Sequence, residues 1–145
     1  KFGRPFFLMQ IDNIKVIYMA EVVKNRPQEL TKAELEIMQV IWQKEKVLVH
    51  DILAELQEPK PAYNTVSTIV RILENKGFVS HKAYGRTYEY FPIVAKEDYT
   101  NTYMRTVLDN FFEGSVSRMV NFFSSQKSIS LEETDEILKI LNGDK

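Results

Sequence analysis

The chain has 145 residues, of which 44% are hydrophobic and 27% charged, so it is long enough for one globular domain and a short appendage. It has no cysteine and only two histidines, which excludes disulfides and thiolate chemistry and disfavours a metal site. The net charge of −1 is unevenly distributed: residues 1–28 carry +3, residues 29–96 carry zero, and residues 97–145 carry −4. No cofactor is expected from this composition.

Residues 1–28 form an N-terminal extension, and residues 1–18 show no clear hydrophobic period. The chain contains no run approaching the ~20 apolar residues of a membrane span, and no signal-peptide pattern, so we expect a cytoplasmic protein. Two interpretations of the extension stay open. Either residues 1–18 belong to the natural protein, or Met19 is the natural first residue.

Three short helices are predicted after the extension. Thr31 and Glu34 have the spacing of a capping box, and a helix over 32–43 follows them. Apolar residues at i, i+3, i+4 and i+7 predict a second helix over 49–57, which two nearby prolines end. A third helix is predicted over 64–76, and Gly77 stands where a left-handed C-terminal cap is expected.

A β-hairpin is predicted next. The prediction rests on strand-forming residues over 78–82, a turn at Gly85, and an alternating run over 87–91 that Pro92 ends. Three short helices followed by a hairpin is the order of a winged helix-turn-helix. The predicted fold class is mainly α with a small β-hairpin wing, in which residues 29–95 form a DNA-binding domain. We expect the tyrosines of the hairpin to pack the wing on the third helix.

The third helix has the pattern of a recognition helix. With its apolar residues facing inward, polar residues occupy the opposite side, where Arg pairs with guanine, Asn with adenine, and Ser or Thr with base or phosphate. Two basic residues flank the hairpin turn and suit phosphate contacts. Lys60 and Lys76 are further phosphate candidates. The predicted DNA-binding residues are Asn64, Thr65, Ser67, Thr68, Arg71, Lys82 and Arg86. The alternative is a winged-helix protein-interaction module that does not bind DNA.

Residues 96–145 read as a helical dimerisation domain. Helices are predicted over 96–113, 115–124 and 131–142, and Ser130 with Glu133 forms a second capping box. Three short helices cannot bury their own aromatic rings, and a symmetric homodimer is the simplest way to cover them. The predicted dimerisation residues are Val107, Leu108, Phe111, Phe112, Val116, Met119, Val120 and Phe123.

Enzyme motifs are missing from the sequence. There is no glycine-rich phosphate loop, no nucleophile elbow and no pair of metal-binding histidines. The chain is therefore not expected to catalyse a reaction.

The stretch 30–142 resembles the penicillinase-repressor family of BlaI/MecI/CopY type. The resemblance rests on four segments: Leu30–Met38 with Trp42, Tyr63–Thr68, Lys76–Val79, and Gly85–Tyr90. The piece from Gly114 to Phe122 matches as well. The resemblance implies a homodimeric repressor with interlocking C-terminal helices, acting on genes for β-lactam resistance or copper handling.

In the β-lactam branch the resemblance implies signalling by a membrane receptor-protease and cleavage of the repressor at an Asn-Phe bond. Asn121-Phe122 stands at the matching place. The copper branch carries C-terminal cysteine pairs, which this chain lacks. Ile72 and Asn75 stand where the family often has basic residues. The resemblance therefore does not imply that this chain binds the family's operator sequence.

Overall fold

A computed structural model describes residues 29–143. The predicted N-terminal extension, with the alternative start at Met19, lies outside the described residues. The chain divides into two compact units, one reaching Thr100 and the other starting at Asn101. Each unit is described by itself.

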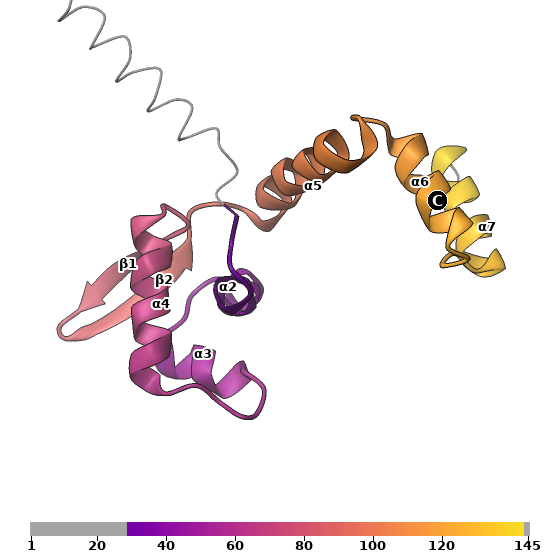
Figure 1. Ribbon diagram of the computed structural model, residues 1–145. Helices are drawn as coiled ribbons and strands as arrows, with labels where there is room; N and C mark the ends of the chain where they lie inside the picture. The colour runs from indigo at the N-terminus through magenta and orange to yellow at the C-terminus, as the bar shows by residue number, and fades with distance from the viewer. Residues whose placement is uncertain (1–28, 144–145) are drawn as a thin grey trace, which may run out of the picture. The chain divides into compact units, whose positions relative to one another are not determined.

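The first unit contains three helices and a two-stranded antiparallel sheet (Figure 1). In chain order these are α2 (Lys32–Lys44), α3 (Val49–Glu55), α4 (Tyr63–Asn75), β1 (Val79–Tyr84) and β2 (Thr87–Pro92). No boundary differs from its predicted position by more than two residues. The first residues of α5 (Lys96–Phe112) also belong to this unit. The order and arrangement are those of a winged helix-turn-helix, which confirms the predicted fold class.

Local signals in the sequence define the ends of these helices. The Glu34 amide donates to Thr31 Oγ1 at 3.2 Å, and the Thr31 amide donates to Glu34 Oε2 at 3.3 Å, so the predicted capping box is present. At the end of α4, Gly77 has φ +83°, and the Phe78 amide donates to the Leu73 carbonyl at 2.9 Å. This is the left-handed cap predicted from the glycine.

One hydrophobic core holds the unit together. It is built from all three helices, the segment after α2 and both strands: Ile37, Met38, Val40, Ile41, Val47, Val49, Ile52, Val66, Val70, Leu73, Phe78, Val79 and Tyr90. Val47 pairs with Tyr90 through two backbone hydrogen bonds of 2.9 and 2.7 Å. This bridge fixes the base of the wing to the segment between α2 and α3, a contact that the sequence analysis did not predict.

The expectation that the hairpin tyrosines pack the wing on α4 is only partly right. Tyr90 is buried, but Tyr84 and Tyr88 are largely exposed. In the register of the hairpin His81 pairs with Tyr90 and Tyr84 pairs with Thr87, which puts Tyr84 on the opposite face of the ribbon from Tyr90. Tyr88 shares the face of Tyr90 but lies nearer the turn, where less of the core covers it.

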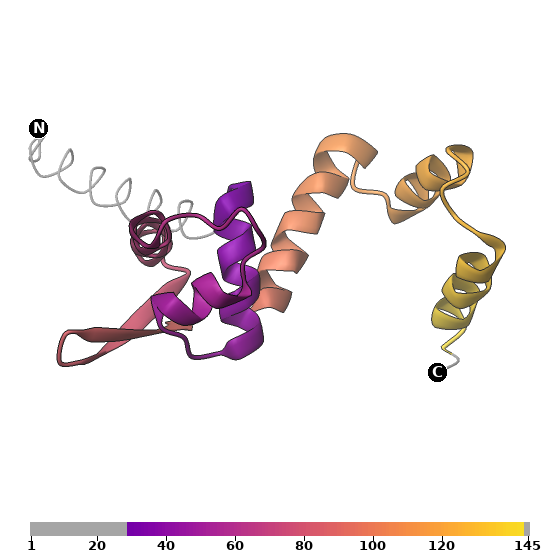
Figure 2. The same ribbon diagram turned by 90° about the horizontal axis from the view of Figure 1, so that it is seen from below.

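The beginning of α5 is attached to the winged helix. The Leu30 amide donates to the Tyr99 hydroxyl at 3.1 Å, and Trp42 Nε1 donates to the Val94 carbonyl at 2.9 Å. The Tyr99 ring lies 5.8 Å from the Trp42 ring and 5.7 Å from the Phe78 ring. Figure 2 shows α2 and the beginning of α5 side by side. The first turn of α5 is therefore part of the first unit's packing.

The second unit contains the rest of α5, α6 (Val116–Ser125) and α7 (Leu131–Leu141). Ser115 caps α6, and the predicted capping box of Ser130 and Glu133 is present at the start of α7, with two hydrogen bonds of 3.1 Å. None of the described residues of α5, α6 or α7 is buried. Across residues 29–143, no helix is both long and apolar enough to cross a membrane.

Candidate nucleic-acid interface

Helix α4 presents two chemically different sides. Val66, Val70 and Leu73 are fully buried against the core. The predicted contact residues Asn64, Thr65, Thr68 and Arg71 are exposed on the other side, and Ser67 is half-buried at its margin. Thr68 Oγ1 donates to the Asn64 carbonyl at 2.8 Å, so its proton is used within the helix. Asn64, Thr68 and Arg71 therefore share one polar face of α4, and Thr65 and Ser67 lie at its two margins.

The start of α4 adds a feature that the sequence analysis missed. Its N-cap is Ala62, and no side chain caps it within the described residues. The first intrahelical hydrogen bond runs from the Val66 amide to the Ala62 carbonyl, so the amides of residues 63–65 have no partner within the helix. An uncapped helix start with no acidic residue in its first turn suits a phosphate group. The sequence could have predicted the missing cap, since no Ser, Thr, Asp or Asn stands directly before this helix.

The wing carries its two predicted cations near its tip. Lys82 on β1 and Arg86 in the turn are both exposed. Gly85 has φ +64°, a conformation that favours glycine, and it lets the chain reverse in the two residues between the strands. Lys82 Nζ lies 5.3 Å from the centre of the Tyr84 ring. The wing therefore presents positive charge on an exposed ribbon.

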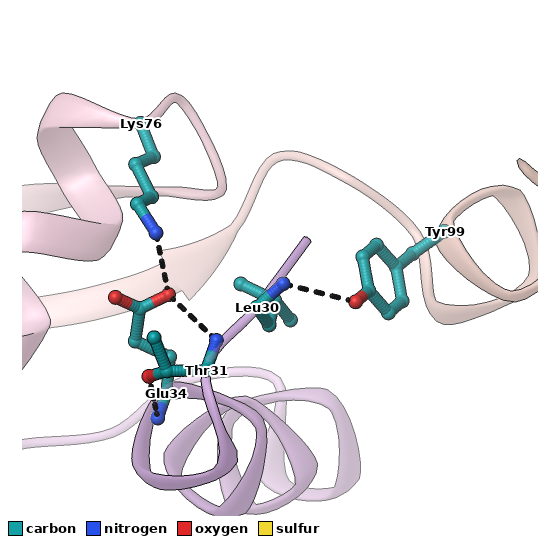
Figure 3. A network of polar contacts seen from close by, with 5 residues as sticks. All are labelled: Leu30, Thr31, Glu34, Lys76 and Tyr99. Carbon is teal, nitrogen blue, oxygen red and sulfur yellow. Dashed lines mark hydrogen bonds and ion pairs between the residues drawn. The ribbon is translucent and has the colours of Figure 1, made fainter. Parts of the chain in front are cut away.

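Lys76, a candidate phosphate contact from the sequence, forms an ion pair within the first unit. Its ammonium lies 2.7 Å from Glu34 Oε2, and Glu34 is buried at 6% exposure. Figure 3 shows this ion pair together with the capping box and the bond from Leu30 to Tyr99. A buried carboxylate needs a compensating charge, so Lys76 joins the end of α4 to the start of α2. Lys60 is also engaged, since its ammonium donates to the Ala54 carbonyl at 3.2 Å.

One acidic side chain lies beside the polar face of α4. Glu74 Oε2 is 2.6 Å from His81 Nδ1 on β1, and the His81 ring stacks on Tyr88 with 4.3 Å between ring centres. Burial raises the pKa of the Tyr90 hydroxyl, Glu74 raises it further, and Arg71 opposes both. The contact of Glu74 with His81 therefore joins α4 to β1 beside Tyr90.

The second unit gathers exposed apolar side chains. Of the predicted dimerisation residues, Phe111, Val116, Val120 and Phe123 are exposed, and Val107, Leu108, Phe112 and Met119 are half-buried. Further exposed apolar residues of this unit lie outside the predicted set: Phe122, Leu131, Leu138, Ile140 and Leu141. Leu131 is 86% exposed and Phe111, Ile140 and Leu141 are 75% exposed. The apolar period of α7 could have predicted three of them, Leu131, Leu138 and Leu141.

The Asn121-Phe122 bond lies in the middle of α6. The Phe122 ring is 5.7 Å from the Phe112 ring and 5.5 Å from the Phe123 ring. Within a single chain Phe122 and Phe123 remain nearly half exposed, which agrees with the expectation that these short helices cannot bury their own aromatic rings.

Comparison with known proteins finds matches that cover most of the chain. The family model described as penicillinase repressor matches residues 30–143. A penicillinase repressor of Bacillus licheniformis is 31% identical over 124 residues, which cover 85% of this chain and 96% of the relative. The methicillin resistance regulatory protein MecI of Staphylococcus aureus (strain N315) is 27% identical over 119 residues, covering 81% of this chain and 97% of the relative.

A solved structure is similar to half of the chain. It is the monomeric form of BlaI of Bacillus licheniformis in complex with the blaP half-operator, with 28% identity and a TM-score of 0.42, covering 50% of this chain and 90% of that chain. The family model covers most of the sequence, including both units described above. The chain therefore belongs to the penicillinase repressor family, a family of transcriptional repressors and not of enzymes.

Proposed function

We propose that this chain is a cytoplasmic, homodimeric repressor that binds operator DNA with the outer face of α4 in the major groove and the wing on the phosphate backbone. The observation that carries the proposal is the two-sided character of α4. Its apolar side anchors it in the core, and its other side offers Arg71, hydroxyl and amide groups beside an uncapped helix start. Membership of a repressor family supports the same assignment.

Replacing Arg71 by Ala should weaken binding to the selected operator by about 1–3 kcal/mol and relax the preference at one base pair. Arg71 is the single Lys or Arg of α4, and its guanidinium suits a bidentate contact with guanine. Fluorescence anisotropy with specific and random duplexes measures both effects. Arg105→Ala removes the same charge from an exposed position of the second unit and should leave affinity unchanged. An equal loss on both duplexes would make Arg71 a phosphate contact instead.

Replacing Lys82 and Arg86 together by Ala should reduce affinity on every DNA sequence. The slope of log affinity against log salt should fall by about one for each phosphate that the wing no longer neutralises, because fewer counterions are released. The measurement is a salt titration of operator binding. The control is Arg105→Ala with Lys127→Ala, which removes two cations from the second unit. An unchanged slope would remove the wing from the interface.

The homodimer part of the proposal rests on the second unit. Its helices bury no described residue, yet they carry large apolar side chains that water contacts. Uncovered apolar surface of this extent is rare on a monomer, and a second copy of the same helices offers a complementary cover. Two recognition helices related by a dyad then require an operator with dyad symmetry.

Induction is proposed to follow cleavage of the Asn121-Phe122 bond, through a membrane receptor-protease that senses a β-lactam. The bond is helical, and proteolysis of a helix needs local unfolding, so the operator-bound dimer should resist cleavage. Cutting there would separate α7 from α5. The dimer would then lose the apolar side chains of α7, which are exposed in a single chain and proposed to be covered in the dimer. The test is to sequence repressor fragments from producing cells exposed to a β-lactam. An intact repressor in cells whose target genes are switched on would end this part of the proposal.

A protein-interaction module is the competing function, and the zero net charge of residues 29–96 favours it. The two functions separate in one experiment. A repressor shifts duplex DNA with an affinity that falls as salt rises, whereas an interaction module gives no salt-dependent shift.

A further inference from the structure

The pairing of Glu74 with His81 joins the recognition helix to the wing. Glu74 lies on α4 three residues after Arg71, and its carboxylate contacts the imidazole of His81 on β1 at 2.6 Å. The two side chains are about one-third exposed, at 31% and 30%. Both therefore remain in contact with solvent at the surface that the proposed function assigns to DNA.

A carboxylate at this place has a consequence for a polyanionic ligand. DNA carries closely spaced negative charges, and an uncompensated Glu74 would repel the phosphates that Arg71 and the wing attract. Histidine is the side chain whose charge changes most readily between about pH 5 and 8. Protonated His81 would cancel the charge of Glu74, whereas neutral His81 would leave it.

The other groups that face His81 keep a constant charge over this range. Tyr88 stacks on the His81 ring, and Tyr90 lies 5.6 Å from it. Burial raises the pKa of the Tyr90 hydroxyl further above neutrality. Arg71, on the same helix as Glu74, stays cationic. Lys82 pairs with Glu89 on the opposite face of the hairpin from His81. Among the described groups around His81, the imidazole itself is therefore the side chain whose type changes charge near neutral pH.

We propose that His81 is a positioning residue which, by contacting Glu74, links operator binding to the uptake of a proton. This inference rests on the proposed function, because it assumes that α4 and the wing meet DNA. In the protonated state the pair is neutral and holds the wing against α4. In the neutral state of His81 the net charge beside the DNA is one unit more negative. Affinity should be high at low pH and fall as pH rises.

The experiment measures operator binding by the full chain between about pH 5.5 and 8.5 at constant ionic strength. The probe is a duplex recovered by in vitro selection from a random library. Affinity of the unaltered chain should fall about fivefold over this range, the size expected for one partly screened charge. Glu74→Gln removes the negative charge while His81 still titrates, so this variant should bind more tightly than the unaltered chain at every pH, by about fivefold at the alkaline end. His81→Gln keeps a donor but no titrating charge, so it should hold affinity near the alkaline-side value.

The chain supplies its own control, since it has only one other histidine. His50 lies on α3, with its ring 4.7 Å from that of Tyr63, and His50→Gln should keep the full pH dependence. A flat profile in the unaltered chain, or a profile abolished by His50→Gln and not by His81→Gln, would overturn the inference and leave the proposed function standing. Failure to bind the duplex at any pH would instead overturn the proposed function.

Discussion

Replacing Phe111 and Leu131 together by Asp should convert the chain to a monomer and reduce operator affinity by about 10²–10⁴-fold. Both side chains are largely exposed in a single chain, so a charge at either position costs the folded monomer little. In a dimer they would be buried, and an unpaired charge there opposes association. The loss in affinity follows because two linked half-sites bind with a high effective concentration that two separate monomers lack.

Sedimentation velocity at micromolar concentration and operator titration measure the two effects. The matched control is Asn110→Asp with Ser128→Asp, which adds the same charge at exposed polar positions close by in the sequence. The control should stay dimeric and bind the operator with nearly unchanged affinity. Equal sedimentation coefficients for all three proteins would refute the assignment of this surface to dimerisation.

Replacing Leu73 by Ala should lower the free energy of unfolding of the first unit by about 2–5 kcal/mol. Leu73 is completely buried, and its carbonyl also accepts the Phe78 amide that ends α4. Removing its side chain leaves a cavity between the recognition helix and the core. Since single domains have about 5–15 kcal/mol of stability in total, this variant should also bind DNA poorly at physiological temperature.

The neighbouring residue provides the control for this prediction. Ile72 is 39% exposed on the other side of α4, and Ile72→Ala should cost about 1 kcal/mol or less. Urea unfolding followed by the fluorescence of Trp42, the single tryptophan, reports on the first unit alone. Similar midpoints for the two variants would show that the inner and outer sides of α4 are wrongly assigned.

The sequence by itself determined the helices, their ends and the two faces of α4. Those features depend on short-range chemistry: the spacing of apolar residues, a hydroxyl three residues before a carboxylate, and a glycine free to adopt positive φ. Thr31 with Glu34 and the glycine after α4 are examples in which the local pattern and the structure agree. The polar face of α4 follows from the same period, since inward Val66, Val70 and Leu73 leave Arg71 outside.

Only the tertiary structure decided which partner each polar or aromatic group finds over a long sequence separation. Lys76 contacts Glu34 across 42 positions, and the Tyr99 hydroxyl meets the Leu30 amide across 69. Glu74 and His81 are only seven positions apart, but they stand on different elements, so their contact also depends on how β1 packs beside α4. No local period encodes these contacts, because each arises when two elements with separate local signals pack on one core. For the same reason Lys76, a phosphate candidate in the sequence, is found in an ion pair with Glu34. The exposure of the apolar residues of the second unit likewise follows only from the placing of its helices.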